Sequence, residues 1–176
     1  ISKSPADTST SALVWTPVSA TGTTLDGIAL KGILYSLSKY IVVGAGGKVA
    51  YGTDISTWTA ATSGTTSDLN AIATNGSIVV AVGAGATIIH SGDGITWTAA
   101  GTVPTTENLS GVAYSTEGVW VAVGANGTLL SSTDGSTWTA RTSGTTAALK
   151  SVSAIASTTN GVTTYTIVAA GANGTL

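Results

Sequence analysis

The stretch Ser132-Thr133-Asp134-Gly135-Ser136-Thr137-Trp138 decides the fold, because the sequence repeats it. Ser91-Gly92-Asp93-Gly94-Ile95-Thr96-Trp97 is a near-identical copy, and Gly52-Thr53-Asp54-Ile55-Ser56-Thr57-Trp58 is a more divergent one. A fourth, longer copy runs from Asp7 to Trp15, and the four tryptophans lie 43, 39 and 41 residues apart. A period of this size is typical of proteins built from repeated supersecondary units.

Each repeat contains four short segments with the composition of β-strands. In one repeat we expect them at Leu109 to Ser115, Val119 to Ala125, Thr128 to Ser132 and Ser136 to Arg141, with Asn-Gly and Asp-Gly at turns. The second segment, with Trp120 as an expected core residue, is apolar at nearly every position, as in strands buried on both faces. Four-stranded sheets stacked around an axis bury strands in this way. The sequence therefore predicts an all-β fold, a β-propeller of four-stranded antiparallel blades.

The four repeats predict a single domain over residues 1–176. The repeats span about 16–58, 59–97, 98–138 and 139–176, the last completed by 1–15. Placed end to end, Thr175-Leu176 and Ile1-Ser2-Lys3-Ser4 reproduce Thr128 to Ser132. This phase fits a closed four-bladed ring, a segment of a longer array, or a junction between Leu176 of one copy and Ile1 of another.

Composition restricts the function. The chain has six basic and eight acidic residues and a net charge of −2, without a basic stripe, so we expect no nucleic-acid partner. Cysteine is absent and His90 is the single histidine, so no metal or cofactor is expected. No apolar run has the length of a membrane span. Few charges and abundant Thr, Ser, Ala and Gly favour an extracellular or virion-surface location.

The Ser-x-Asp-Gly-x-Thr-Trp turn resembles the Asp-box, or bacterial neuraminidase repeat, of sialidases, sortilin-type receptors, photosystem II assembly factors and phage and bacterial surface propellers. The resemblance spans nearly the whole chain and implies a β-propeller of the non-enzymatic phage or bacterial surface kind. In such a turn the Asp accepts backbone N–H groups, the Gly adopts a positive φ and the Trp seals neighbouring sheets. The residues with this expected structural role are Asp7, Trp15, Asp54, Trp58, Ser91, Asp93, Gly94, Trp97, Ser132, Asp134, Gly135 and Trp138.

The resemblance to sialidases does not extend to their catalytic residues. Sialidases hold the substrate carboxylate with an arginine triad, whereas Arg141 is the single arginine here. Other glycosidases need two facing carboxylates. Asp68 and Glu107 occupy equivalent places in their repeats, which more often means solvated loops than a catalytic pair. We expect no enzyme; the alternative, a fragment of a sialidase- or glycosidase-like enzyme, needs arginines and carboxylates from outside these residues.

The favoured function is a non-catalytic binding or assembly module on a phage particle or bacterial surface. In propellers the loops between blades and the turns between the second and third strands share one face, here called the loop face. Short polar side chains on it suit carbohydrate hydroxyls, so a surface glycan or a protein receptor is the expected partner. The candidate ligand-binding residues are Asp68, Glu107, Asn108, Lys48, Asn126 and Asn173.

The alternative is a structural building block of a fibre, tail or surface layer. Its strand at Leu176 and Ile1 would pair with another subunit or with a neighbouring part of a parent chain. An open strand edge is a template for such pairing.

Overall fold

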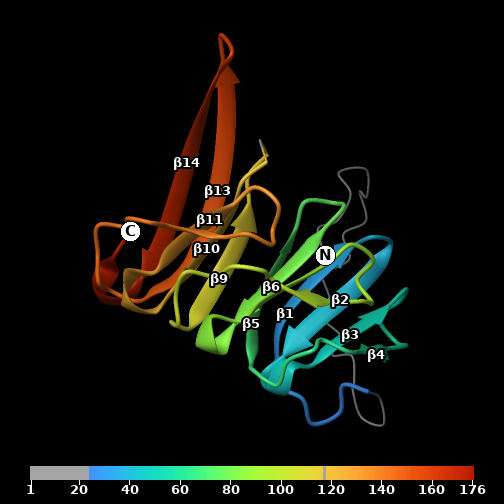
Figure 1. Cartoon of the computed structure of the whole chain (residues 1–176). Helices are drawn as coiled ribbons and strands as arrows, with labels where there is room; N and C mark the ends of the chain where they lie inside the picture. Colours follow the sequence, from blue (N-terminus) through green and yellow to red (C-terminus); the bar gives the residue numbers. More distant parts are fainter. Residues whose placement is uncertain (1–23, 117) are drawn as a thin grey trace, which may run out of the picture.

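Every strand of the described chain belongs to an antiparallel sheet. The structure, a computed structural model, describes residues 24–116 and 118–176 (Figure 1). Blade 1 contains β1 (Leu30–Ser36), β2 (Lys39–Gly44), β3 (Val49–Gly52) and β4 (Thr59–Ala61). Blade 2 contains β5 (Leu69–Thr74), β6 (Val79–Gly83), β7 (Ile88–Ser91) and β8 (Thr98–Ala99). Blade 3 contains β9 (Leu109–Tyr114), β10 (Trp120–Gly124), β11 (Leu129–Ser132) and β12 (Thr139–Arg141), and blade 4 contains β13 (Leu149–Thr159) and β14 (Val162–Gly171).

The strands predicted in the third repeat are confirmed by β9 to β12, with ends that coincide or differ by at most three residues. In each complete blade the strands pair in sequence order. All five residues of β6 and all five of β10 are buried, as the apolar runs predicted. Trp120 is a core residue, as expected.

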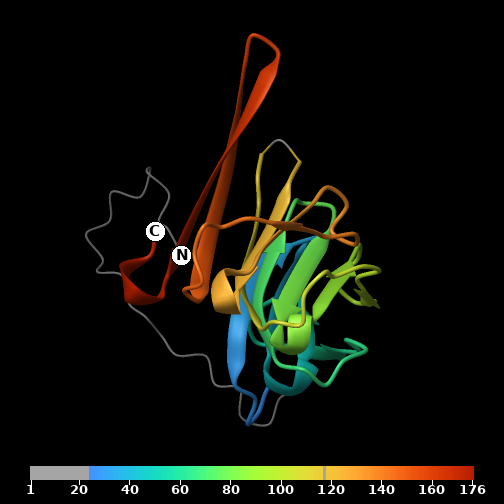
Figure 2. The ribbon, with the colours of Figure 1, turned by 60° about the vertical axis from the view of Figure 1, so that its left-hand side comes forward.

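The blades follow one another in an arc, and their first strands lie side by side: β1 next to β5, β5 next to β9, and β9 next to β13 (Figures 1 and 2). A core of mostly aliphatic side chains, with some tryptophans, fills each space between blades. Between blades 1 and 2, for example, Ile41 and Val43 pack with Leu69 and Trp97. Face-to-face packing of four-stranded sheets buries both faces of the inner strands, which is the architecture of a β-propeller.

A tight turn follows the second strand of every blade, and in blades 1 to 3 it joins the second strand to the third. These turns are single 3-10 turns, η1 (Ala45–Gly47), η2 (Ala84–Ala86), η3 (Ala125–Gly127) and η4 (Ala172–Gly174). The turn brings two backbones together: a Cβ on Gly127, whose φ is +68°, would overlap the carbonyl oxygen of Thr145. In η3, glycine satisfies both the positive φ and the close backbone contact.

Blade 4 departs from the other three. Its two strands are 11 and 10 residues long, and they continue as a hairpin beyond the other blades (Figure 1). The hairpin closes at Asn160 and Gly161, with φ values of 52° and 76°, the signs that a type I′ turn requires. This extension was not predicted. The predicted completion of the blade by residues 1–15, with Asp7 and Trp15, lies outside the described residues.

Candidate functional site

The loop face is formed where the chain passes from one blade to the next. The residue before each first strand accepts, through its carbonyl oxygen, the N–H of the turn in its own blade, as in Ala84 N–H to Asp68 (2.9 Å) and Ala125 N–H to Asn108 (2.9 Å). Asp68 and Asn108 also reach the preceding blade through their side chains: Gly46 N–H donates to Asp68 and Gly85 N–H to Asn108, each at 2.8 Å. Inter-blade loops and turns therefore meet on one face.

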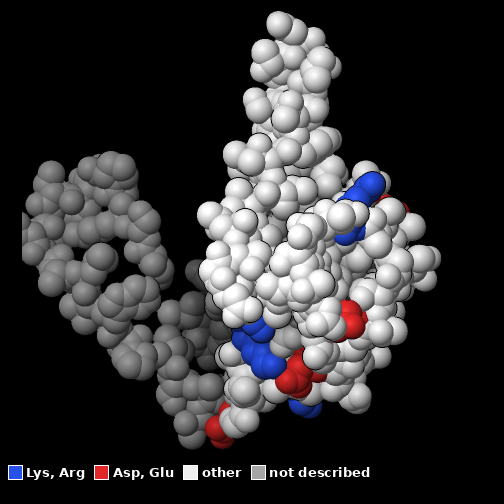
Figure 3. Space-filling view, turned by 90° about the vertical axis from the view of Figure 1, so that its left-hand side faces the viewer, with Lys and Arg blue, Asp and Glu red and all other residues white. Residues whose placement is uncertain are grey.

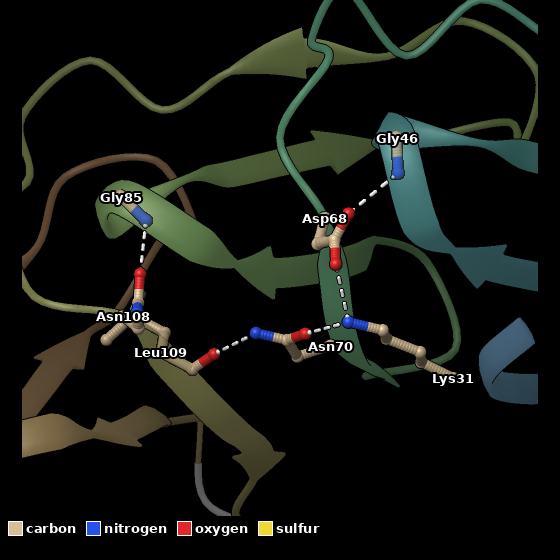
Figure 4. A network of polar contacts seen from close by, with 7 residues as sticks. All are labelled: Lys31, Gly46, Asp68, Asn70, Gly85, Asn108 and Leu109. Carbon is tan, nitrogen blue, oxygen red and sulfur yellow. Dashed lines mark hydrogen bonds and ion pairs between the residues drawn. The ribbon is translucent and has the colours of Figure 1, made fainter. Parts of the chain in front are cut away.

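Asp68 is the centre of a polar network between blades 1 and 2 (Figure 4). Its second carboxylate oxygen accepts a hydrogen bond from Lys31 at 2.7 Å, and Lys31 also donates to Asn70 at 3.0 Å. The hydrogen bond from Lys31, followed by that from Gly46 N–H, lowers the pKa of Asp68. Asn70 continues the network by donating to the carbonyl oxygen of Leu109 at 2.8 Å. The network links three blades at the loop face.

Lys31 and Asn70 were not predicted as site residues. Both occupy a β-bulge, where the pairing of the first strand with the second skips one residue. The same irregularity recurs in blades 3 and 4. In the sequence, this bulge is marked by a polar residue that directly follows the leucine at the start of the first strand. The four bulge residues are Lys31, Asn70, Ser110 and Lys150.

The other predicted residues lie on the same face without joining this network. Lys48, Asn126 and Asn173 are exposed beside their turns, and their side chains make no hydrogen bond within the described part of the chain. Glu107 contacts the neighbouring turn through its backbone, because its carbonyl oxygen accepts Ala86 N–H at 2.9 Å. Asp68 and Asn108 thus connect blades through their side chains and Glu107 through its backbone, whereas Lys48, Asn126 and Asn173 are exposed.

The Asp–Trp turns, defined here as Gly52–Trp58, Ser91–Trp97 and Ser132–Trp138, lie at the opposite ends of the blades. Asp93 accepts the N–H groups of Ile95 and Thr96 at 2.7 Å each. Hydrogen bonds from Thr96 N–H, Ile95 N–H and the Ser91 hydroxyl lower the pKa of Asp93 to about 2. Asp134 has the same surroundings, and its pKa is also lowered to about 2, chiefly by the N–H groups of Thr137 and Ser136.

In these turns the Asp side chains accept hydrogen bonds from the turn backbone. Asp54, which lacks the following glycine, still accepts Ser56 N–H at 2.8 Å and Thr57 N–H at 2.7 Å. Trp97 and Trp138 are buried between blades, and Trp58 is partly buried. Among residues 24–116 and 118–176 no three His, Cys, Asp or Glu side chains gather as a metal site would require, and no helix is long and apolar enough to span a membrane.

The sheets, their order and the inter-blade cores define a β-propeller fold. Two solved structures of YCF48, a β-propeller protein, resemble the chain. "YCF48 from Cyanidioschyzon merolae" has a TM-score of 0.55 and 19% identity, over 64% of this chain and 37% of that one. "YCF48 bound to D1 peptide" has a TM-score of 0.58 and 15% identity, over 68% of this chain and 43% of that one. No family model and no curated protein matches the sequence. The likeness, which spans less than half of either YCF48 chain, concerns the fold.

Proposed function

We propose that the chain is a non-catalytic binding module that recognises cell-surface carbohydrate through its loop face. The observation that carries this proposal is the position of Lys48, Asn126 and Asn173. They project from equivalent turns on one face, are exposed, and make no hydrogen bond within the described residues. Amide and ammonium groups of this kind donate readily to hydroxyl oxygens. The network around Asp68 holds the turns of adjacent blades in fixed positions, as a preorganised site requires.

The Asp-box resemblance and the low charge favour display on a phage particle or bacterial surface, in an extracellular or virion setting. A protein receptor is the second class of partner. YCF48, whose fold this chain shares, has been solved bound to a D1 peptide, so this fold is used elsewhere for binding a peptide. Carbohydrate is the preferred ligand because the exposed side chains of the loop face are polar and mostly uncharged.

We further propose that the module does not catalyse hydrolysis. Of the two carboxylates in equivalent positions, Asp68 is already bound by Lys31 and by Gly46 N–H, and its pKa is lowered. A general acid for glycoside cleavage needs a raised pKa instead. Release of nitrophenol from nitrophenyl glycosides or sialosides tests this point. Turnover that disappears in Glu107→Gln would show that the chain is an enzyme after all.

The binding proposal is tested with glycan arrays and whole bacterial cells. The loop-face variant is Lys48→Ala with Asn126→Gly and Asn173→Gly, where glycine removes the amide and tolerates the positive φ of 52° and 57°. The matched control is Thr53→Ala with Thr133→Ala, two exposed positions in the Asp–Trp turns at the other end of the blades. We expect binding that the loop-face variant loses and the control retains. Equal binding by both variants would place the site elsewhere, and no binding by the unmodified chain would refute the proposal.

The second candidate is a structural building block completed by another subunit. The observation that favours it is blade 4, which has two strands in the described residues where the other blades have four. The outer edge of β14 can therefore accept a further strand.

A further inference from the structure

Each junction inside the arc joins the same two faces. One blade contributes a valine or isoleucine of its second strand, and this side chain is fully buried against the next blade. These residues are Ile41, Val80 and Val121. The next blade contributes the leucine that begins its first strand, namely Leu69, Leu109 or Leu149. The repeat thus builds one type of junction three times.

The last blade exposes the first of these two faces. Val168 lies three residues before Gly171, as Val80 lies three residues before Gly83, and it is 45% exposed where Val80 is 0% exposed. Leu176 follows η4 as Ile88 follows η2, and it is 89% exposed where Ile88 is 3% exposed. Together with Ile155, which is 60% exposed, these side chains form an apolar tail face.

The first blade exposes the second face. Leu30 pairs with the glycine that ends its neighbouring strand, as Leu69 does, yet it is 44% exposed where Leu69 is 0% exposed. Ile33 and Tyr35, further along β1, are 62% and 60% exposed. Ile72, the counterpart of Ile33 in blade 2, packs against the preceding blade. Leu30, Ile33 and Tyr35 form an apolar head face.

The tail of the arc also has an open strand edge with a groove beside it. A groove of about 560 Å³ lies between blade 3 and β14, lined by Leu129 and Arg141 on one side and by Tyr165 and Ile167 on the other. Third and fourth strands added to blade 4 would lie there. Residues 151–176 contain no charged residue, and the hairpin surface in Figure 3 is uncharged along its length. An edge strand without charged side chains does not repel another strand that pairs with it.

We propose that a second copy of this chain binds head to tail, so that its head face covers the tail face of the first copy. The tail face and the head face correspond to the two faces that meet at each of the three internal junctions. Their side chains are therefore of the kinds that already pack against each other within the chain.

A second copy offers each end face of the described arc the same kind of partner face that it has at the internal junctions. A junction between the head face of one copy and the tail face of another is heterologous. Repeated junctions of this kind close into a ring or extend into a filament. The inference rests on the building-block role and is independent of ligand binding at the loop face.

Native mass spectrometry and sedimentation velocity of the chain test the proposal. We expect at least twice the 17.1 kDa of one chain. Val168→Asp on the tail face and Ile33→Asp on the head face should each give monomers, and circular dichroism verifies that both variants fold. Thr98→Asp, at an exposed position on the outer strand β8, is the matched control and should still associate.

The decisive sample is an equimolar mixture of the two monomeric variants. One copy retains a tail face and the other a head face, so the mixture should form a complex of one copy of each. A monomeric unmodified chain, association that survives both substitutions, or a mixture that stays monomeric would overturn the second-copy proposal.

A peptide with the sequence of residues 128–141, which contains third and fourth strands and their Asp–Trp turn, separates the two levels of inference. If the unmodified chain is monomeric but binds this peptide, strand completion stands and the second copy is the wrong occupant. If the chain neither associates nor binds the peptide, the building-block role fails as well.

Discussion

The carboxylate of Asp68 accepts the backbone N–H of Gly46 at 2.8 Å, so that a loop of one blade holds the turn of the blade before it. Asn108 makes the equivalent contact with Gly85 N–H, also at 2.8 Å. At the third junction the same position is Ala148, whose methyl group cannot accept a hydrogen bond. The side-chain link between blades is therefore ionic at the first junction, neutral at the second and missing at the third.

This gradation predicts the effect of substitutions at the three positions. Asp68→Ala removes the hydrogen bond to Gly46 N–H and the ion pair with Lys31, so it should lower the melting temperature more than Asn108→Ala. Ala148→Asn should raise the melting temperature by supplying the missing acceptor for η3. Differential scanning calorimetry measures all three. Equal effects of Asp68→Ala and Asn108→Ala would show that the ion pair adds nothing.

The Asp–Trp turns predict a loss of stability in acid. Asp93 and Asp134 have pKa values of about 2, below their usual value of 3.8, because N–H and hydroxyl donors stabilise the carboxylates. A carboxyl whose pKa is lowered on folding stabilises the folded state above its unfolded pKa, and this contribution is lost as the pH falls through the folded value. We therefore expect the free energy of unfolding to fall between about pH 4 and pH 2.

The double variant Asp93→Asn with Asp134→Asn is the control for this prediction, because asparagine keeps an acceptor oxygen but does not titrate. Urea unfolding at pH 6 and at pH 2.5 should show a smaller loss of stability in the double variant than in the unmodified chain. An identical loss in both would assign the acid sensitivity to other carboxyl groups.

Two buried tryptophans differ in a single hydrogen bond. Trp138 Nε1 donates to the carbonyl oxygen of Gly135 at 3.2 Å, whereas Trp97 Nε1 is buried without a partner in the described part of the chain. Replacement by phenylalanine removes the indole N–H in both cases. Because only Trp138 gives up a hydrogen bond, Trp138→Phe should be less stable than Trp97→Phe by about 1 kcal/mol, measured by urea unfolding. If Trp97→Phe were the less stable variant, lost packing volume rather than the lost hydrogen bond would determine the stability of both variants.

The turn glycines give a prediction about close backbone contacts. Gly127→Ala places a methyl group against the carbonyl oxygen of Thr145 at a φ of +68°, so it should destabilise the fold strongly. Gly92→Ala is the matched control, because nothing lies within 4 Å of its Cβ position and its φ is not positive. Thermal melting should separate the two variants by several degrees, on the order of 2–4 °C for each kcal/mol. Similar melting temperatures would mean that η3 shifts without cost.

Much of the fold could be predicted from the sequence because each repeat contains its own signals. The apolar run at Val79–Gly83 and the turn glycines specify a doubly buried strand without reference to other blades. The hairpin of blade 4 could not be predicted in the same way. Its outer half is held by backbone pairing between Ser157 and Thr164 and beyond, not by burial, so the apolar-run criterion does not detect it.

The candidate site was predictable only in part. Repeat phase placed Asp68 and Asn108 on the loop face, and each of them contacts a turn of the preceding blade. Lys31 and Asn70 were missed because their contacts depend on a bulge in the strand and on the spacing between blades. The partners of Lys31, which are Asp68 and Asn70, lie 37 and 39 residues further along the sequence.

The stacking of blades has a consequence for the order in which the protein opens. Each blade is held by its immediate neighbours, so the arc behaves as a one-dimensional array in which stability is shared between adjacent units. Blade 2 has a neighbour on both sides, whereas the hairpin of β13 and β14 is held from one side within the described residues. Local opening should therefore begin at blade 4 and reach β6, at the centre of the arc, last. A partner bound to the tail face would place blade 4 between two neighbours. The rate at which blade 4 opens would then depend on assembly.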